Sequence, residues 1–275
     1  MKNFKVFISL ILVLIAGLAV TDYVSATPSA SFHEKNGDVF DDWGIYRTRG
    51  FGEDGFYQIS EIDFRPVIAF ESLGEDTDLA YNLGKQIALN YPDEMQRAEA
   101  IFRFVRDRVN YTSDADQFGY DEFAQNADEL AATIGQDEVA YGDCEDSTVL
   151  LAVMYKGAGY RSAIAVGDGH TAALVYLPGY DKTAAVFEVE GESGWVWAEA
   201  TGKNNPLGWV PKQFINVELA AYEISPEPIA LIKPSAAPSV AVTKTGGGGS
   251  SRPFPFIGVI GLLWFMSLFR RKRVR

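Results

Sequence analysis

The chain has 275 residues, of which 47% are hydrophobic, 13% aromatic and 22% charged, and it carries a formal net charge of −13 and a single cysteine. This content is enough for a folded core and excludes a disordered acidic polymer. The acidic excess argues against nucleic acid or anionic lipid as a partner, because phosphate binding needs clustered basic side chains, and one cysteine excludes a disulfide framework.

Residues 1–26 have the features of a secretory signal peptide. Lys2 and Lys5 precede an apolar run, and the small residues of Val24-Ser25-Ala26 form a pattern that signal peptidase accepts. We therefore expect residues 1–26 to be removed and the rest of the chain to be exported. A retained N-terminal anchor is the alternative.

Residues 27–75, called the N-terminal segment below, are predicted to be irregular and partly β-stranded. Aromatic and β-branched residues favour strands, and here they recur between glycines and acids: Trp43, Tyr46, Phe51, Phe56, Tyr57, Ile59, Ile62, Phe64. We expect a separate domain to follow at residues 76–224.

Two helices are predicted at the start of that domain. The first covers residues 78–91, and the second covers 92–109 with a proline at its start, where proline is tolerated. The second helix has one apolar face at helical spacing, made of Ala98, Ile101, Phe102, Val105 and Val109. Its arginines are expected to form a solvated face: Arg97, Arg103, Arg106, Arg108.

A central helix and a run of strands are predicted next. Asp143 can cap a helix that ends at Gly157 and Gly159, and its inward face would carry Val149, Leu150, Val153 and Met154. Short β-type runs follow at 162–166, 171–176, 184–189 and 195–198. Helices followed by consecutive strands predict an α+β fold, with an antiparallel sheet packed on the central helix.

Beyond residue 224 the composition changes. Residues 225–252 are rich in Pro, Ser, Ala and Gly, which predicts an extended and flexible stalk. Residues 253–275 contain an uncharged run that ends at a basic cluster, which predicts a transmembrane anchor with its basic end inside the cell. The same pattern resembles the sorting signals that archaeosortase and exosortase systems process, so a sorting enzyme is an alternative partner. Either reading tethers an extracellular domain to the cell membrane.

The only cysteine lies where a helix would make its thiol nucleophilic. Cys144 falls in the predicted first turn of the central helix, between Asp143 and Glu145. Unpaired amide N–H groups and the positive end of the helix dipole stabilise a thiolate there, whereas the neighbouring carboxylates oppose it. The thiolate therefore needs a cationic partner, for which the sequence offers His33 and His170.

His170 is the predicted partner of this cysteine. It opens a predicted strand, and a strand start beside the helix N-terminus would bring the imidazole to the sulfur. A third group should accept a hydrogen bond and fix the ring tautomer. We favour Glu199, at the end of the strand predicted for 195–198, while Asp168 and Asp181 compete for this role.

At these residues the chain resembles a known family. Gly-Asp-Cys-Glu-Asp opens a helix, Gly-Tyr ends it, Gly-His opens a strand, and an acid is followed by Ala-Thr. This pattern resembles the transglutaminase-like superfamily of papain-related cysteine enzymes, and it is closest to archaeal transglutaminase-like proteins and bacterial transglutaminase-like cysteine proteinases. The resemblance covers residues 76 to about 215. It implies a papain/transglutaminase-like core, with Cys144 as nucleophile, His170 as general base and acid, and Glu199 as the orienting acid.

The resemblance also bears on the oxyanion donor and on metal. The family's aromatic-Trp-Gln pattern is replaced here by Glu-Phe-Ala-Gln, which leaves Gln125 as a candidate oxyanion donor beside the Cys144 N–H. Some relatives bind calcium with the acids beside their cysteine, and Asp143, Glu145 and Asp146 offer the oxygen ligands that calcium takes. We favour a capping and solvated role for these acids, and otherwise expect no cofactor.

The predicted function is a surface-tethered cysteine hydrolase, a peptidase or amidase, that acts on a peptide or protein through a thioester. Acyl transfer from protein glutamine is the related enzymatic reading, and hydrolysis is favoured because nothing in the sequence indicates a second amine site. The alternative is a catalytically weak binding module of the same fold, which recognises an envelope polymer or a peptide.

Overall fold

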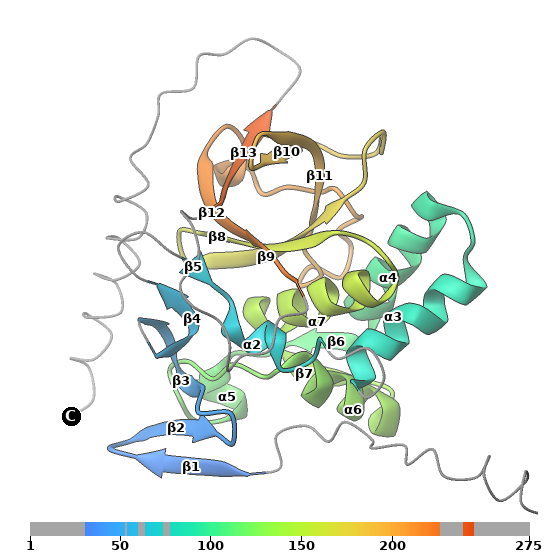
Figure 1. Cartoon of the computed structure of the whole chain (residues 1–275). Coiled ribbons are helices and arrows are strands. Elements are labelled where there is room, and N and C mark those ends of the chain that lie inside the picture. Colours follow the sequence, from blue (N-terminus) through green and yellow to red (C-terminus); the bar gives the residue numbers. More distant parts are fainter. Residues whose placement is uncertain (1–30, 53, 60–63, 74–77, 226–238, 245–275) are drawn as a thin grey trace, which may run out of the picture.

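The structure, a computed structural model, describes residues 31–52, 54–59, 64–73, 78–225 and 239–244 (Figure 1). The predicted signal peptide and C-terminal anchor lie outside the described residues, as does most of the predicted stalk. Within the described part of the chain, no helix is long and apolar enough to cross a membrane.

The N-terminal segment forms a five-stranded sheet in the order β1 (Phe32–Lys35), β2 (Asp38–Asp41), β3 (Tyr46–Gly52), β4 (Gly55–Ile59) and β5 (Phe64–Arg65). Neighbouring strands are antiparallel except β3 and β4, which are parallel. A short helix, α2 (Val67–Phe70), follows. Apolar side chains of β4, β5 and α2 belong to the same core as the later helices. The segment is therefore more regular than its sequence predicts, and it shares its core with the following domain.

The two helices predicted after it are confirmed as α3 (Leu79–Asn90) and α4 (Glu94–Arg108). Asp93 caps α4, since its side chain accepts a hydrogen bond from the Gln96 N–H, so the proline precedes the helix. The predicted apolar face of α4 is buried. Its arginine face is not only solvated, because Arg97 contacts the Tyr160 hydroxyl and Arg106 donates to the Asn205 carbonyl.

Four short elements that the sequence analysis did not predict connect α4 to the central helix. They are β6 (Val109–Tyr111), α5 (Asp114–Gln117), α6 (Ala127–Asp137) and β7 (Ala140–Gly142). β6 and β7 pair in parallel. The end of β7 leads directly into the central helix, so this small sheet fixes where that helix begins.

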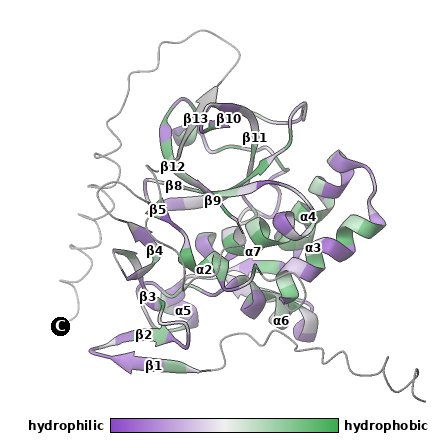
Figure 2. Ribbon diagram, viewed as in Figure 1, coloured by the Kyte–Doolittle hydropathy of each residue, from purple (hydrophilic) through white to green (hydrophobic). Residues whose placement is uncertain are grey.

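The predicted central helix is confirmed as α7 (Cys144–Gly157). It is buried along almost its whole length and contacts α3, α4, α6, β8 and β9 (Figure 1). Figure 2 shows hydrophilic residues on the β1–β2 hairpin and where α3 ends and α4 begins. Gly159, with a φ of 88°, lets the chain turn out of the helix, and the Tyr160 N–H then bonds to the Tyr155 carbonyl.

The predicted strands are confirmed as β8 (Ser162–Gly167), β9 (His170–Tyr176), β10 (Val186–Val189) and β11 (Glu192–Ala198). With β12 (Glu218–Glu223) and β13 (Ser239–Lys244) they form a closed antiparallel barrel in the order β10-β11-β9-β8-β12-β13, which lies above α7 in Figure 1. The α+β prediction is thus confirmed, with a barrel in place of an open sheet.

The last barrel strand corrects the predicted stalk. Residues 239–244 lie inside the range 225–252, yet they pair with both β10 and β12. The local sequence Ser-Val-Ala-Val-Thr-Lys explains this, because β-branched residues at alternating positions favour a strand. The high average content of Pro, Ser, Ala and Gly over residues 225–252 does not reveal this short β-type run.

Candidate active site

Cys144 is the first residue of α7, and its thiol is half-buried. The free N–H groups and the positive dipole end of a 14-residue helix therefore lie at this sulfur. Gly142, two residues before Cys144, allows the main chain to pack closely against Asp146. A Cβ at Gly142 would come 2.5 Å from Asp146 Oδ2 and 2.8 Å from Asp146 Cβ. The local sequence thus sets both the start of the helix and the place of the thiol.

Asp146 holds the first turn of α7 in place. Its Oδ2 accepts hydrogen bonds from the Asp143 N–H (3.3 Å) and from Gln125 Nε2 (2.8 Å), and its Oδ1 accepts one from the Gln125 N–H (2.7 Å). The residue is fully buried. Burial raises the pKa of Asp146, as does the nearby Asp143, while the Gln125 hydrogen bonds oppose the rise.

Glu145 is the other acid beside the thiol, and it is only 6% exposed. Its Oε2 accepts a hydrogen bond from Cys144 Sγ at 3.3 Å, and no N–H or hydroxyl group of the described residues donates to its buried Oε1. Burial raises the pKa of Glu145 well above its ordinary value, and Asp143 and Cys144 add to the rise. The expected solvated role of Glu145 and Asp146 is therefore wrong, because both face inward between the helix and its neighbours.

His170 opens β9, and strand pairing brings it to Glu199. β9 and β11 are antiparallel with Ala173 opposite Ala198, so the start of β9 lies beside the end of β11. His170 Nε2 lies 3.0 Å from Glu199 Oε2. The two groups form an ion pair. The two competing acids, Asp168 and Asp181, are exposed.

The charges around His170 favour its cationic form. Burial lowers the pKa of His170, but its contacts with Cys144 and Glu199 outweigh burial and raise it to about 10. Burial likewise raises the pKa of Glu199, while hydrogen bonds and the charge of His170 bring it below the ordinary value. Thr201 Oγ1 and Trp197 Nε1 also donate to the Glu199 carboxylate, at 2.7 and 3.3 Å.

The structure thus brings the three predicted residues together from three elements. Cys144 and Glu199 both act on the pKa of His170, so the thiol and the carboxylate both lie near the imidazole ring. A cationic imidazole between a thiol and a carboxylate is the arrangement that cysteine nucleophiles need. His33, the other histidine, lies at an exposed site on β1 and pairs with Asp42.

Gln125 does not present a free amide to this site. Its Nε2 donates to the Tyr141 carbonyl at 2.9 Å and to Asp146 Oδ2 at 2.8 Å, so both hydrogens of the amide are engaged. Its observed contacts therefore serve the helix start rather than an oxyanion. The Cys144 N–H remains the main-chain donor that a helix N-terminus offers.

The acids beside Cys144 fit a hard cation. One oxygen each from Asp114, Glu122 and Glu145 lie within 4.8 Å of one another, as do oxygens from Asp114, Asp143 and Asp146. Within the described part of the chain, no N–H or hydroxyl group donates to the buried Oδ1 of Asp143 or Oε1 of Glu145. Carboxylate oxygens converging in this way are the donors that calcium takes. Asp114 and Glu122 are further candidate calcium ligands, beyond the three acids that the sequence predicted.

Aromatic side chains complete the surroundings of the histidine, and the sequence analysis did not assign them. The His170 ring stacks on Phe214, with centroids 5.6 Å apart, and on Trp197, with centroids 6.4 Å apart. Tyr57, from the N-terminal segment, is fully buried near Thr171, and the charges of Glu145, Cys144 and Asp146 act on its phenol. Trp197 lies in the strand predicted at 195–198, where alternate residues share a face, so the sequence could have indicated that it packs near the site. No sequence spacing relates Tyr57 to the site.

Comparison with known proteins bears on the domain that carries this site. A search of curated proteins finds no match to the chain. Residues 81–213 match the family model of the Transglutaminase-like superfamily, a range that contains Cys144, His170 and Glu199 and leaves out β1 to β5. This match, together with the α+β core and the start of α7 at a cysteine, supports placing the domain in the transglutaminase-like superfamily.

Proposed function

We propose that this chain is a cysteine hydrolase that cleaves peptide or amide bonds through a thioester on Cys144. The observation that carries the proposal is the contact of His170 Nε2 with Glu199 Oε2 at 3.0 Å, beside a thiol close enough to raise the pKa of the ring. The nearer kinship with archaeal proteins and bacterial cysteine proteinases, inferred from motifs, is part of the same proposal.

The first half of the reaction forms the thioester. The Cys144 thiolate attacks the substrate carbonyl carbon, and the oxygen that becomes negative accepts a hydrogen bond from the Cys144 N–H. His170 donates its proton to the leaving amine as the C–N bond breaks. The acyl group is then bound to sulfur, and His170 is neutral.

The second half restores the enzyme. Neutral His170 takes a proton from water as the water oxygen attacks the thioester carbonyl. The tetrahedral adduct collapses, the C–S bond breaks, and a carboxylic acid leaves. Thiolate and imidazolium are restored, with Glu199 holding the ring orientation throughout. An amine in place of water would give acyl transfer by the same steps.

A bound calcium ion would be held by Asp114, Asp143 and Asp146, or by Asp114, Glu122 and Glu145, and it would neutralise negative charge next to the thiol. We further propose that the domain faces the exterior of the cell, tethered by the C-terminal segment or processed by a sorting enzyme. These proposals rest on the terminal sequences and on the oxygen donors at the start of α7.

One observation favours the alternative, a catalytically weak binding module. Cys144 Sγ donates to Glu145 Oε2 at 3.3 Å, and a thiol held by a carboxylate is a poorer nucleophile than a thiolate. A binding module would bind its polymer or peptide unchanged when Cys144 or His170 is replaced by alanine. A hydrolase would lose turnover in both variants.

The test is labelling of Cys144 by iodoacetamide at pH 7 to 8, with cleavage of a mixed peptide library followed by mass spectrometry. We expect rapid labelling and cleavage by the wild type, neither in Cys144→Ala, and slow labelling in His170→Ala. Hydroxylamine added to the library would trap the Cys144 thioester as hydroxamate products, whether water or an amine is its usual acceptor. A wild-type thiol that iodoacetamide does not modify would overturn the proposal.

A further inference from the structure

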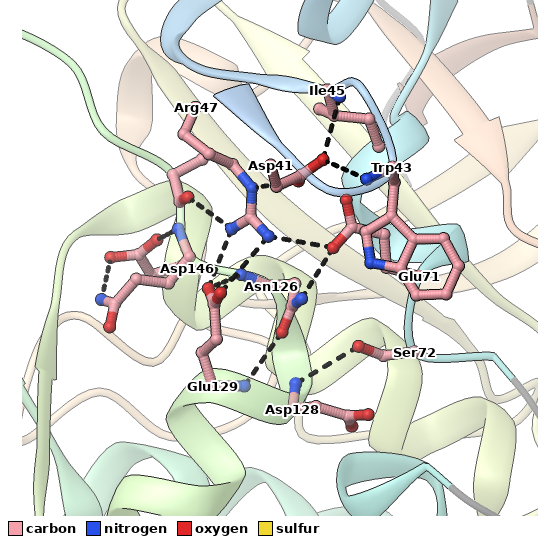
Figure 3. A network of polar contacts seen from close by, with 12 residues as sticks. Asp41, Trp43, Ile45, Arg47, Glu71, Ser72, Asn126, Asp128, Glu129 and Asp146 are labelled. Atoms are coloured by element: carbon pink, nitrogen blue, oxygen red, sulfur yellow. Dashed lines mark hydrogen bonds and ion pairs between the residues drawn. The ribbon is translucent and has the colours of Figure 1, made fainter. Parts of the chain in front are cut away.

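The position of the Cys144 thiol is connected to a buried arginine that lies outside the matched family region. Arg47, in β3, is fully buried, and all five of its N–H donors are used (Figure 3). The acceptors are carboxylates of Asp41, Glu71 and Glu129 and the main-chain carbonyl of Ala124. A planar guanidinium can satisfy such a set, whereas an ammonium cannot.

Arg47 holds Ala124 on both sides of that residue. Its Nη1 donates to the Ala124 carbonyl at 2.9 Å, and its own carbonyl accepts from the Ala124 N–H at 2.9 Å. Its carboxylate partner Glu129 forms a capping box with Asn126, which begins α6. The segment 123–126 is thus fixed at its middle and at its end by one buried network.

Gln125, the next residue, connects this fixed segment to helix α7, which begins at Cys144. Gln125 donates its N–H and its Nε2 to the two oxygens of Asp146, and Asp146 in turn accepts from the Asp143 N–H. Asp146 lies in the first turn of α7, two residues after Cys144. A continuous set of contacts of 2.7 to 3.3 Å therefore runs from Ala124 to the residue that precedes the thiol.

We propose that Arg47 is a positioning residue for Cys144, acting through Ala124, Gln125 and Asp146. Its importance for catalysis rests on the proposed function. The N-terminal segment is then part of the working enzyme, because it supplies the group that holds the start of α7 against the β6–β7 pair and so directs the sulfur at His170.

The test compares two variants that interrupt this connection at different points. Arg47→Lys keeps a positive charge among the buried acids but loses donors, and Gln125→Ala leaves the Arg47 ion pairs intact. Arg161→Lys is the matched control, because Arg161 also pairs with two carboxylates, Glu192 and Glu223, but lies on the barrel. All variants are studied as the full-length chain, with thermal melting to establish that each is folded.

Two measurements separate positioning from stability alone. The first is the rate of Cys144 alkylation by iodoacetamide at pH 9 divided by the rate at pH 7. Alkylation forms no oxyanion, so this ratio does not depend on any role of Gln125 as an oxyanion donor. The second is hydrogen exchange of the amides of residues 143–147 under native conditions. A general loss of stability lowers the melting temperature without changing the alkylation ratio of the folded protein.

We expect both test variants to raise the alkylation ratio about fivefold or more, since the thiolate loses its fixed helix terminus, and to speed exchange at 143–147. The control should stay within about twofold of the wild type, as expected for a site outside the connection. If a folded Gln125→Ala protein has the wild-type alkylation ratio and the wild-type rates of hydrogen exchange at residues 143–147, the proposal is overturned, even if Arg47→Lys fails to fold. If the wild-type thiol is unreactive the proposed function fails, and hydrogen exchange alone then decides whether Arg47 positions the helix.

Discussion

At the scale of single residues, Glu199 decides how the imidazole is held. Its carboxylate faces His170 at 3.0 Å and accepts hydrogen bonds from Thr201 and Trp197. Glu199→Gln keeps the shape of the side chain and removes its charge. We expect turnover to fall about 10²- to 10⁴-fold, because the imidazolium loses the negative charge that stabilises and orients it.

Initial rates on the best library peptide test this expectation. Glu192→Gln is the control, because Glu192 lies at the other end of the same strand and pairs with Arg161. A Glu199→Gln enzyme with more than half of the wild-type rate would show that another group orients His170.

The same pair predicts how stability depends on pH. The pKa of His170 is raised to about 10 in the folded protein from an ordinary value of 6.5. The folded state therefore gains stability from this group that is fully present below pH 6.5 and is lost as the pH rises towards 10. The stability difference between the wild type and His170→Gln should shrink over that interval.

Thermal melting of both proteins from pH 5.5 to 10 measures this difference. His33→Gln is the control substitution, at an exposed site on β1. A difference between the wild type and His170→Gln that stays constant across the whole range would contradict a cationic His170.

At the scale of elements, α3 and α7 approach each other at two glycines. A Cβ at Gly157 would come 2.0 Å from the Tyr81 carbonyl oxygen, and one at Gly84 would come 2.0 Å from the Met154 carbonyl oxygen. Main-chain atoms cannot move aside as side chains can. Gly157→Ala should therefore destabilise the protein by about 1–3 kcal/mol or more, because the helices must separate.

Gly135 in α6 offers a matched comparison, since a Cβ there would meet no atom of the described residues within 4 Å. Gly135→Ala should be neutral or stabilise by up to about 1 kcal/mol, through helix propensity. Urea denaturation of the two variants gives both values. Equal effects of the two substitutions would show that the helices tolerate the larger separation.

At the scale of the whole molecule, the boundary predicted at residue 75 does not separate two cores. Phe64 and Ile68 are fully buried in the cluster that also contains Val149 and Leu150 of α7, and Arg47 neutralises acids on both sides of the boundary. A chain of residues 76–224 would expose this apolar surface and leave Glu129 without its arginine. Such losses exceed the usual stability of a domain.

We therefore expect residues 76–224 alone to lack a cooperative thermal transition by near-ultraviolet circular dichroism, whereas residues 31–244 should show one. The comparison also tests whether β13 belongs to the domain, because residues 31–225 should melt at a lower temperature than 31–244. A sharp transition in the 76–224 chain would contradict a shared core.

Residue patterns predicted the candidate residues of this site because their signals are local. A single cysteine at a helix start and a histidine at a strand start can be read from a few neighbouring residues. Helices α3, α4 and α7 also follow from periodicity and from prolines and glycines near their ends. The roles of Glu145 and Asp146 were not readable in this way, because charged residues in a first turn are usually solvated and only the packing of Gln125 and β7 buries them.

The sequence by itself predicted the candidate nucleophile, its histidine partner, the helices α3, α4 and α7 and the strands β8 to β11, since each depends on spacing within one element. Only the tertiary structure decided that Glu199 rather than Asp168 or Asp181 pairs with His170, since that choice depends on the register of β9 against β11. It likewise decided that the strands close into a barrel and that Arg47 connects to the first turn of α7. These contacts join residues far apart in the chain, and no local pattern encodes which distant groups meet.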